Sequence, residues 1–258
     1  YGLVGSEMCI RDRITAVVNN QAAKDNLLAN LLATVQEKSF QGVDIDFEYI
    51  RPEDRIPFAD FVADVRDYLA PYGYHVSVAL APQTSDEQAG LLYEGKDYGL
   101  LGEAADSVLL MTYEWGYTYG PPMAVAPVNQ VRRVVEYAVT RIDPAKIDLG
   151  IPNYGYDWTL PFVQGSSRAT TVSNLEAVRI AVEAGVPIQF DEVAMSPFFQ
   201  YEKEGRLHEV WFEDVRSYQA KFALLPEYGL RGMGYWQIMR FFRPNWLLLE
   251  NTFAIQRP

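Results

Sequence analysis

The sequence predicts an α/β fold built around a parallel sheet, and two features of residues 14–258 predict it. Segments with helical spacing of apolar residues alternate with short apolar runs. Several of these runs are almost continuously apolar, which is typical of strands that helices cover on both faces. With 258 residues, of which 49% are hydrophobic, the chain is long enough to bury a substantial core.

The first half of the chain is expected to form helices and strands in turn. Apolar spacing predicts one helix over about 25–38, with Asp25 at its start, and another over about 53–70 that ends before Gly73. Three strands are predicted from apolar runs, at about 40–49, 75–82 and 106–115.

The second half continues this alternation with one interruption. A helix within 123–142, a strand over 146–158, a helix over 213–225 that Pro226 and Gly229 end, and a last strand over 230–238 are expected. Between them, about 159–211 is predicted to be a small α+β insertion. It has a helix near 174–185 and a hairpin that turns at Glu204 and Gly205.

Charge and composition exclude several classes of function. The net charge of -12 argues against a nucleic-acid partner, because such binding needs a cationic surface. No apolar run reaches the length of a membrane span. Cys9 is the sole cysteine, so the printed sequence holds no internal disulfide framework.

The stretch QGVDIDFEYI carries three acids on alternate residues, Asp44, Asp46 and Glu48. On a strand these side chains share one face, with neighbouring acids about 6.6 Å apart. Charged residues are rarely buried unless they are paired, so the acids indicate either a catalytic group or the solvated face of an edge strand. Spacing alone leaves both interpretations open.

Four segments together resemble the family-18 glycoside hydrolases, the chitinase-like enzymes. GVDIDFE resembles the family's Asp-x-Asp-x-Glu signature, and Met111-Thr112-Tyr113-Glu114 resembles its Met-x-Tyr-Asp segment. GIPNYGYDW and GMGYWQI are similar to its seventh-strand and eighth-strand segments. The order and spacing agree over residues 14–258, most closely with the branch of spore-cortex and cell-wall N-acetylglucosaminidases.

The resemblance implies a (β/α)8 TIM-barrel type of fold, with the site at the carboxyl ends of the strands. In such a barrel the Asp44 strand is the fourth, yet residues 14–39 leave room for one helix only. We therefore expect an incomplete barrel over 14–258, with about strands 4–8 present and the insertion before the last strand. Residues 1–13, which resemble translated adapter sequence, are expected to be a non-native leader.

The resemblance also implies a catalytic set of Glu48, Asp46, Asp44 and Tyr113. Family 18 uses the N-acetyl oxygen of the substrate as nucleophile, with Glu48 as general acid and then general base. Asp46 would orient the acetamido group and share a proton with Asp44, both being buried supports. Tyr113 would donate its hydroxyl to the acetamido carbonyl, although a tyrosine that only packs in the core is the alternative.

The resemblance also implies substrate-binding residues, with weaker support than for the catalytic set. Trp236 would stack under a pyranose ring, since aromatic faces combine apolar area with rigidity. Glu114 stands where the family usually has Asp, which puts its hydrogen bond in doubt. Weaker candidates are Tyr154 and Trp158 at the rim of the cleft, and Gln83 reaching into it.

The sequence therefore predicts a retaining glycosidase that acts on β-linked N-acetylglucosamine polymers. Peptidoglycan or cortex fragments are the first expectation and chitin the second. No metal or organic cofactor is implied, and His75 and His208 show no metal-ligand grouping. We expect a monomer that is extracellular, in the cell wall or associated with the spore. The alternatives are a non-catalytic, lectin-like carbohydrate-binding module, or a chain that truncation makes inactive.

Overall fold

The computed structural model describes residues 13–255, and its contacts divide the chain into two compact units. Apart from Arg13, the predicted leader lies outside the described residues. The first unit comprises the described part of Tyr1–Met111 together with Val134–Asp148 and Leu230–Gly232. The second comprises Thr112–Arg133, Leu149–Gly229 and the described part of Met233–Pro258.

Parallel strands form the centre of the first unit. β1 (Gly42–Ile45) pairs in parallel with β2 (His75–Leu80), and β2 pairs in parallel with β3 (Ser107–Leu110). The sheet order is β1-β2-β3-β4-β10, and the first residues of β4 (Ile147–Pro152) and β10 (Gly232–Trp236) belong to this unit. The predicted parallel sheet is therefore confirmed.

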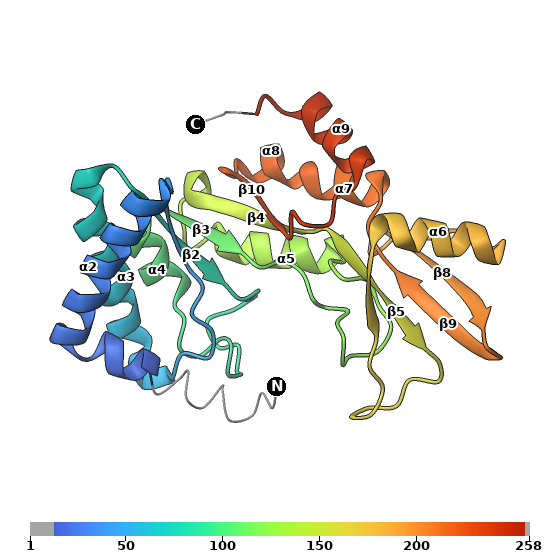
Figure 1. Ribbon diagram of the computed structural model, residues 1–258, viewed down its shortest axis with the longest axis horizontal. Helices are drawn as coiled ribbons and strands as arrows, with labels where there is room; N and C mark the ends of the chain where they lie inside the picture. Colours follow the sequence, from blue (N-terminus) through green and yellow to red (C-terminus); the bar gives the residue numbers. More distant parts are fainter. Residues whose placement is uncertain (1–12, 256–258) are drawn as a thin grey trace. The chain divides into compact units, whose positions relative to one another are not determined.

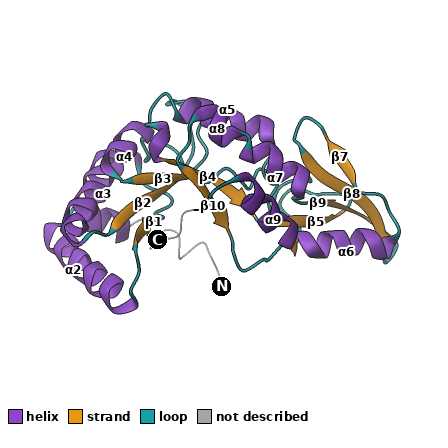
Figure 2. Cartoon of the chain, turned by 90° about the horizontal axis from the view of Figure 1, so that it is seen from above, coloured by secondary structure: helices purple, strands orange, loops and turns teal. Residues whose placement is uncertain are grey.

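Helices α2 (Gln21–Lys38), α3 (Arg55–Leu69) and α4 (Tyr98–Ala104) lie along one side of β1, β2 and β3 (Figure 2). Helix α3 buries one face of apolar side chains, including Phe58 and Phe61. Asn20 caps α2, because its side chain accepts a 3.0 Å hydrogen bond from the Ala23 amide. Asp25 is therefore inside this helix, and its predicted place at the helix start is wrong. Short 3₁₀ turns lie at Pro52–Asp54, Ala70–Tyr72 and Pro144–Lys146.

The single strand predicted over 146–158 is wrong. β4 ends at Pro152, and β5 (Tyr154–Thr159) belongs to a second, antiparallel sheet. Asn153 separates the two strands, and its amide donates a 2.9 Å hydrogen bond to the Trp236 carbonyl. Because the residues on both sides of Asn153 are apolar or aromatic, hydropathy gives no sign of the break.

The antiparallel sheet forms most of the second unit, in the order β6-β5-β9-β8-β7. Besides β5, its strands are β6 (Thr170–Ser173), β7 (Gln189–Asp191), β8 (Ser196–Lys203) and β9 (Arg206–Trp211). β8 and β9 form the predicted hairpin. Glu204 (φ 53°) and Gly205 (φ 72°) are both left-handed, as a tight two-residue turn requires.

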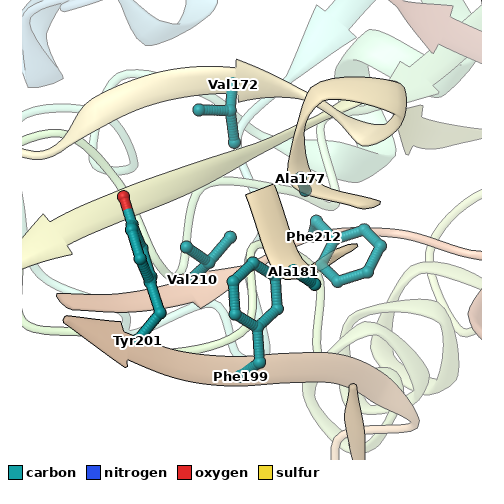
Figure 3. Packing of buried hydrophobic residues seen from close by; sticks show 7 residues of the cluster. All are labelled: Val172, Ala177, Ala181, Phe199, Tyr201, Val210 and Phe212. Carbon is teal, nitrogen blue, oxygen red and sulfur yellow. The ribbon is translucent and has the colours of Figure 1, made fainter. Parts of the chain in front are cut away.

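Helix α6 (Asn174–Ala184) packs on this sheet through small side chains (Figure 3). Ala177 and Ala181 let the helix come close to Phe199, Val210 and Phe212, and all five residues are buried. The helix begins with a capping box in which the Ser173 side chain accepts from the Glu176 amide. The predicted α+β insertion thus has its own hydrophobic core.

Three further helices follow β9, and Figure 1 shows them in orange and red. They are α7 (Val215–Phe222), α8 (Leu224–Tyr228) and α9 (Arg243–Thr252). The single helix predicted over 213–225 is wrong at its end, because Pro226 lies in the first turn of α8, where proline is tolerated. Helix α5 (Val128–Ala138) spans the boundary of the units in sequence. No helix among residues 13–255 is long and apolar enough to cross a membrane.

Candidate active site

The segment that carries Asp44, Asp46 and Glu48, here called the acid segment, begins on β1 and continues past the end of that strand. Asp44 lies on the strand and accepts a hydrogen bond from the Ser77 hydroxyl on β2, whereas Asp46 and Glu48 follow the end of the strand. The expectation that Asp44 and Asp46 are buried supports is wrong, because both are exposed. Among residues 13–255, β1 is the first strand in the sheet order and pairs with β2 alone.

Phe47 fixes the direction of the acid segment. Its ring stacks on Phe58 and Phe61 of α3, with centroids 5.9 Å and 5.7 Å away. Tyr49 then adopts a left-handed backbone with φ 57°, which costs a bulky residue about 1–2 kcal/mol. Asp46, Phe47 and Glu48 line a pocket of about 230 Å³ with Arg13, Ile14 and Val17.

A buried lysine, which the sequence analysis did not single out, faces these acids. Lys96 is 4% exposed, and its Nζ donates a 2.9 Å hydrogen bond to the Ala79 carbonyl. Burial lowers the pKa of Lys96 to about 8, while the charges of Asp46, Glu48 and Asp44 oppose that shift. Partial desolvation of its carboxylate also raises the pKa of Asp46, although the residue as a whole is exposed; Lys96 offsets part of this rise and Asp44 adds to it.

Gln83 lies in the same part of the first unit. It lines a second cavity of about 310 Å³ together with Lys96 and Tyr93. Its side-chain amide donates a 2.9 Å hydrogen bond to the Tyr93 carbonyl, so this group is engaged within the protein. The structure thus associates Gln83 with Lys96, and contact with substrate stays a prediction.

In the second unit, Glu114 is the centre of a tyrosine cluster. Its carboxylate accepts hydrogen bonds from the hydroxyls of Tyr154, at 2.9 Å, and Tyr156, at 2.8 Å. The backbone of Glu114 is left-handed, with φ 66°, a conformation that needs surrounding contacts to persist. Burial, and next the Glu114 charge, raises the pKa of both tyrosines, so they remain donors over the ordinary pH range.

Tyr154, Tyr156 and Trp158 alternate along β5, with neighbouring ring centroids 5.6 Å apart. Trp158 is 1% exposed and its indole N–H donates a 2.8 Å hydrogen bond to the Gly120 carbonyl. Tyr154 is buried as well. A place at the rim is therefore wrong for both residues, because they form a core beneath Glu114. Tyr113 is half-buried and packs against the same cluster.

Trp236 ends β10 and is 53% exposed, so its ring is available for stacking. The Trp236 carbonyl accepts the hydrogen bond from the Asn153 amide that was described above. The Asn153 side-chain oxygen lies 3.0 Å from the buried Tyr218 hydroxyl, which accepts a hydrogen bond from Asn174. Sequence reasoning missed Asn153 and Tyr218, since neither residue belongs to a pattern that predicts a supporting role.

The structure thus brings the predicted residues together in two sets, one in each unit. The charges of Asp44, Asp46 and Glu48 all act on Lys96, and Glu114 accepts from Tyr154 beside Tyr113. Among residues 13–255, no group of histidine, cysteine, aspartate and glutamate side chains could hold a metal ion.

Comparison with known proteins decides the family. The model of the glycosyl hydrolases family 18 matches residues 8–240. The chain belongs to this family. The cortical fragment-lytic enzyme of Bacillus subtilis is 46% identical over 240 residues, which cover 93% of this chain and 56% of the relative.

Solved structures of family-18 relatives have the same fold. The spore cortex-lytic enzyme SleL of Bacillus cereus superposes with a TM-score of 0.92 at 40% identity, covering 95% of this chain and 57% of that one. A chitinase from Chromobacterium violaceum superposes with a TM-score of 0.85 at 28% identity, covering 93% of this chain and 74% of that one. The family-18 fold is a TIM barrel, and the five strands β1, β2, β3, β4 and β10 confirm the predicted incomplete barrel with an α+β insertion. The chain spans slightly more than half the length of the cortical fragment-lytic relatives.

Proposed function

We propose that this chain is a retaining glycosidase that cleaves β-linked N-acetylglucosamine polymers, with Glu48 as general acid and base. Membership of family 18 supports the reaction class. The observation that carries the proposal is the buried Lys96, whose Nζ is bound to the Ala79 carbonyl and whose pKa is affected by the charges of Asp46, Glu48 and Asp44. An edge strand that carries acids only for solubility has no need of a buried cation beside them.

The proposed reaction proceeds in two steps. First, the acetamido oxygen of the substrate attacks the anomeric carbon while Glu48 gives its proton to the leaving oxygen, which produces an oxazolinium ring and a released sugar chain. Then Glu48 takes a proton from water, and the water oxygen opens the ring at the anomeric carbon. Two displacements at one carbon retain its configuration.

Asp46 is proposed to stabilise the positive oxazolinium ring with its carboxylate. Neighbouring carboxylates resist simultaneous ionisation, and in this set of acids such repulsion is proposed to favour a protonated Glu48 beside an ionised Asp46. Desolvation is the largest cause of the raised pKa of Asp46, and the Asp44 charge adds to the rise, which supports repulsion between these acids. A general acid must hold its proton near the working pH, which such a set allows.

Residues of the second unit receive their roles from the family resemblance. Tyr113 is proposed to donate to the acetamido carbonyl, and Trp236 to stack on a pyranose ring. The exposure of Trp236 supports stacking, and the two tyrosine hydroxyls that hold Glu114 support a fixed carboxylate for a sugar hydroxyl.

For the substrate, we propose peptidoglycan or spore-cortex fragments before chitin. Relatives named cortical fragment-lytic enzyme are up to 46% identical, whereas the Chromobacterium chitinase is 28% identical. An extracellular, cell-wall or spore-associated site of action follows from the same proposal. A lectin-like module is the alternative from another class, and the presence of Glu48 argues against it.

Sugar release from purified cortex fragments and from chitooligosaccharides tests this proposal when the chain is compared with Glu48→Gln. We expect reducing ends from cortex fragments to appear at least a hundredfold more slowly with the variant, since general acid catalysis contributes that much. Glycan binding without release by either protein would favour the lectin-like alternative. Equal release by both would show that Glu48 is not the acid.

A further inference from the structure

Lys96 is held at the level of Asp46 by two features of the first unit. The β1–β2 register pairs Asp44 with Ser77 and Ile45 with Val78. Continued by one residue, it places Ala79 beside Asp46. Since the Lys96 Nζ donates to the Ala79 carbonyl, the ammonium is bound at the strand position where the acid segment leaves the sheet.

Gly95, the residue before Lys96, packs its loop against the segment that carries the acids. A Cβ at Gly95 would lie 2.2 Å from the Ile50 carbonyl oxygen and 2.5 Å from its carbon, so the two backbones touch. Ile50 is two residues beyond Glu48. The loop that carries Lys96 is therefore packed directly on the segment that carries Glu48.

Four of the other charged groups around the cavity that Lys96 lines have partners of their own. Arg55 forms an ion pair with Asp97, and Asp86 forms one with Arg141. Glu87 and Glu94 also line this cavity, and the Glu94 carboxylate accepts from the Gly90 amide. Lys96 is the cation whose charge favours ionisation of Asp46, and the acids that face it are Asp44, Asp46 and Glu48.

We propose that Lys96 is a positioning residue of the acid cluster. Its buried ammonium keeps Asp46 ionised while Glu48 carries the proton, and so sets the pH range over which the chain acts. This inference rests on the proposed function. The ammonium bound to Ala79 offsets the mutual repulsion of the carboxylates without itself being a reacting group.

Carboxylate ¹³C NMR titration of the full chain tests this inference without requiring turnover. Lys96→Met removes the charge, Lys96→Arg keeps it, and Asp46→Asn identifies the Asp46 signal. Lys146→Met is the matched control, because Lys146 also donates to backbone carbonyls of this unit, those of Gly102 and Ala105. Loss of a neighbouring cation raises a carboxylate pKa by about one unit or more, so we expect the Asp46 midpoint to rise by about one pH unit in Lys96→Met. In Lys96→Arg and Lys146→Met, the Asp46 midpoint should stay within a few tenths of a pH unit of its value in the unaltered chain.

The pH profile of kcat/KM on cortex fragments gives the second measurement. Both limbs should move to higher pH in Lys96→Met and stay in place in Lys96→Arg. At a fixed pH on the acid limb, a shift of one unit lowers kcat/KM about tenfold. An Asp46 titration that is unchanged in Lys96→Met, or shifted equally in Lys146→Met, would overturn the inference. If the unaltered chain releases no sugar, the proposed function fails, and the titration still decides the role of Lys96.

Discussion

The Tyr154 hydroxyl donates a 2.9 Å hydrogen bond to the Glu114 carboxylate, and Tyr156 adds a second at 2.8 Å. Glu114 has a left-handed backbone, so these two bonds help to hold a conformation that is unfavourable for a residue with a side chain. Tyr154, predicted at the rim of the cleft, is thus a buried support for Glu114, the residue that is expected to meet substrate.

Replacing both donors tests this support. Tyr154→Phe with Tyr156→Phe should lower the free energy of unfolding by about 1–2 kcal/mol in urea denaturation, because each net hydrogen bond contributes about 1 kcal/mol. Tyr117→Phe serves as the control, since its ring is exposed. If the double variant unfolds at the same urea concentration as the control, the bonds to Glu114 do not stabilise the fold.

Gly95→Ala should destabilise the first unit. The new methyl group would meet the Ile50 backbone, which cannot move aside as a flexible side chain could, and such overpacking costs about 1–3 kcal/mol. Gly99→Ala is the matched control, because its Cβ would lie 3.3 Å from the Asp97 side chain, within helix α4, where alanine is favoured. The midpoint temperature of thermal unfolding should therefore fall in Gly95→Ala and rise in Gly99→Ala. A shift in the same direction for both variants would contradict the close contact between Gly95 and Ile50.

The second unit contains an ion pair with no exposed atoms, between Lys221 and Glu213, with Nζ and Oε2 2.8 Å apart. Lys221→Met leaves Glu213 buried without its cation, and breaking such a pair costs about 3–5 kcal/mol at neutral pH. Arg216→Met removes a partly exposed partner of Asp214 and should cost less than about 1 kcal/mol. Urea denaturation that gives equal losses for the two variants would show that the pair is not buried in solution.

Glu213 should also make stability depend on pH. Burial raises its pKa above the ordinary 4.5, although Lys221 opposes the shift, so the folded state binds the proton more tightly than the unfolded state. Its contribution is present below about pH 4.5 and is lost as pH rises through the folded pKa. Relative to Glu213→Gln, the unaltered chain should lose unfolding free energy as pH rises above 4.5. A constant difference, or a gain, would mean that the pKa is not raised.

Local sequence patterns predicted most elements but not every break between them. Hydrophobic periodicity indicates α3, and the Glu204-Gly205 pair indicates the hairpin, because each depends on neighbouring residues alone. The break at Asn153 could not be predicted, since it arises when β5 pairs with β9 about fifty residues later. The burial of Trp158 also depends on this pairing of distant strands.

The candidate site shows the same limit. The alternating acids and the exposed Trp236 could be identified from short motifs. Lys96 could not, because one lysine in a loop has no pattern. Its importance comes from the parallel register, which pairs Ile45 with Val78 just before Asp46 and Ala79, and from the contact of Gly95 with Ile50.

The configuration of the first sugar released tests the central claim most directly. When the chain acts on a β-linked N-acetylglucosamine oligomer, ¹H NMR recorded before mutarotation should show the β-anomer of the new reducing end, and Glu48→Gln should show no release on the same timescale. An α-anomer as first product would contradict the two-step mechanism in which the acetamido group is the nucleophile and Glu48 is the acid.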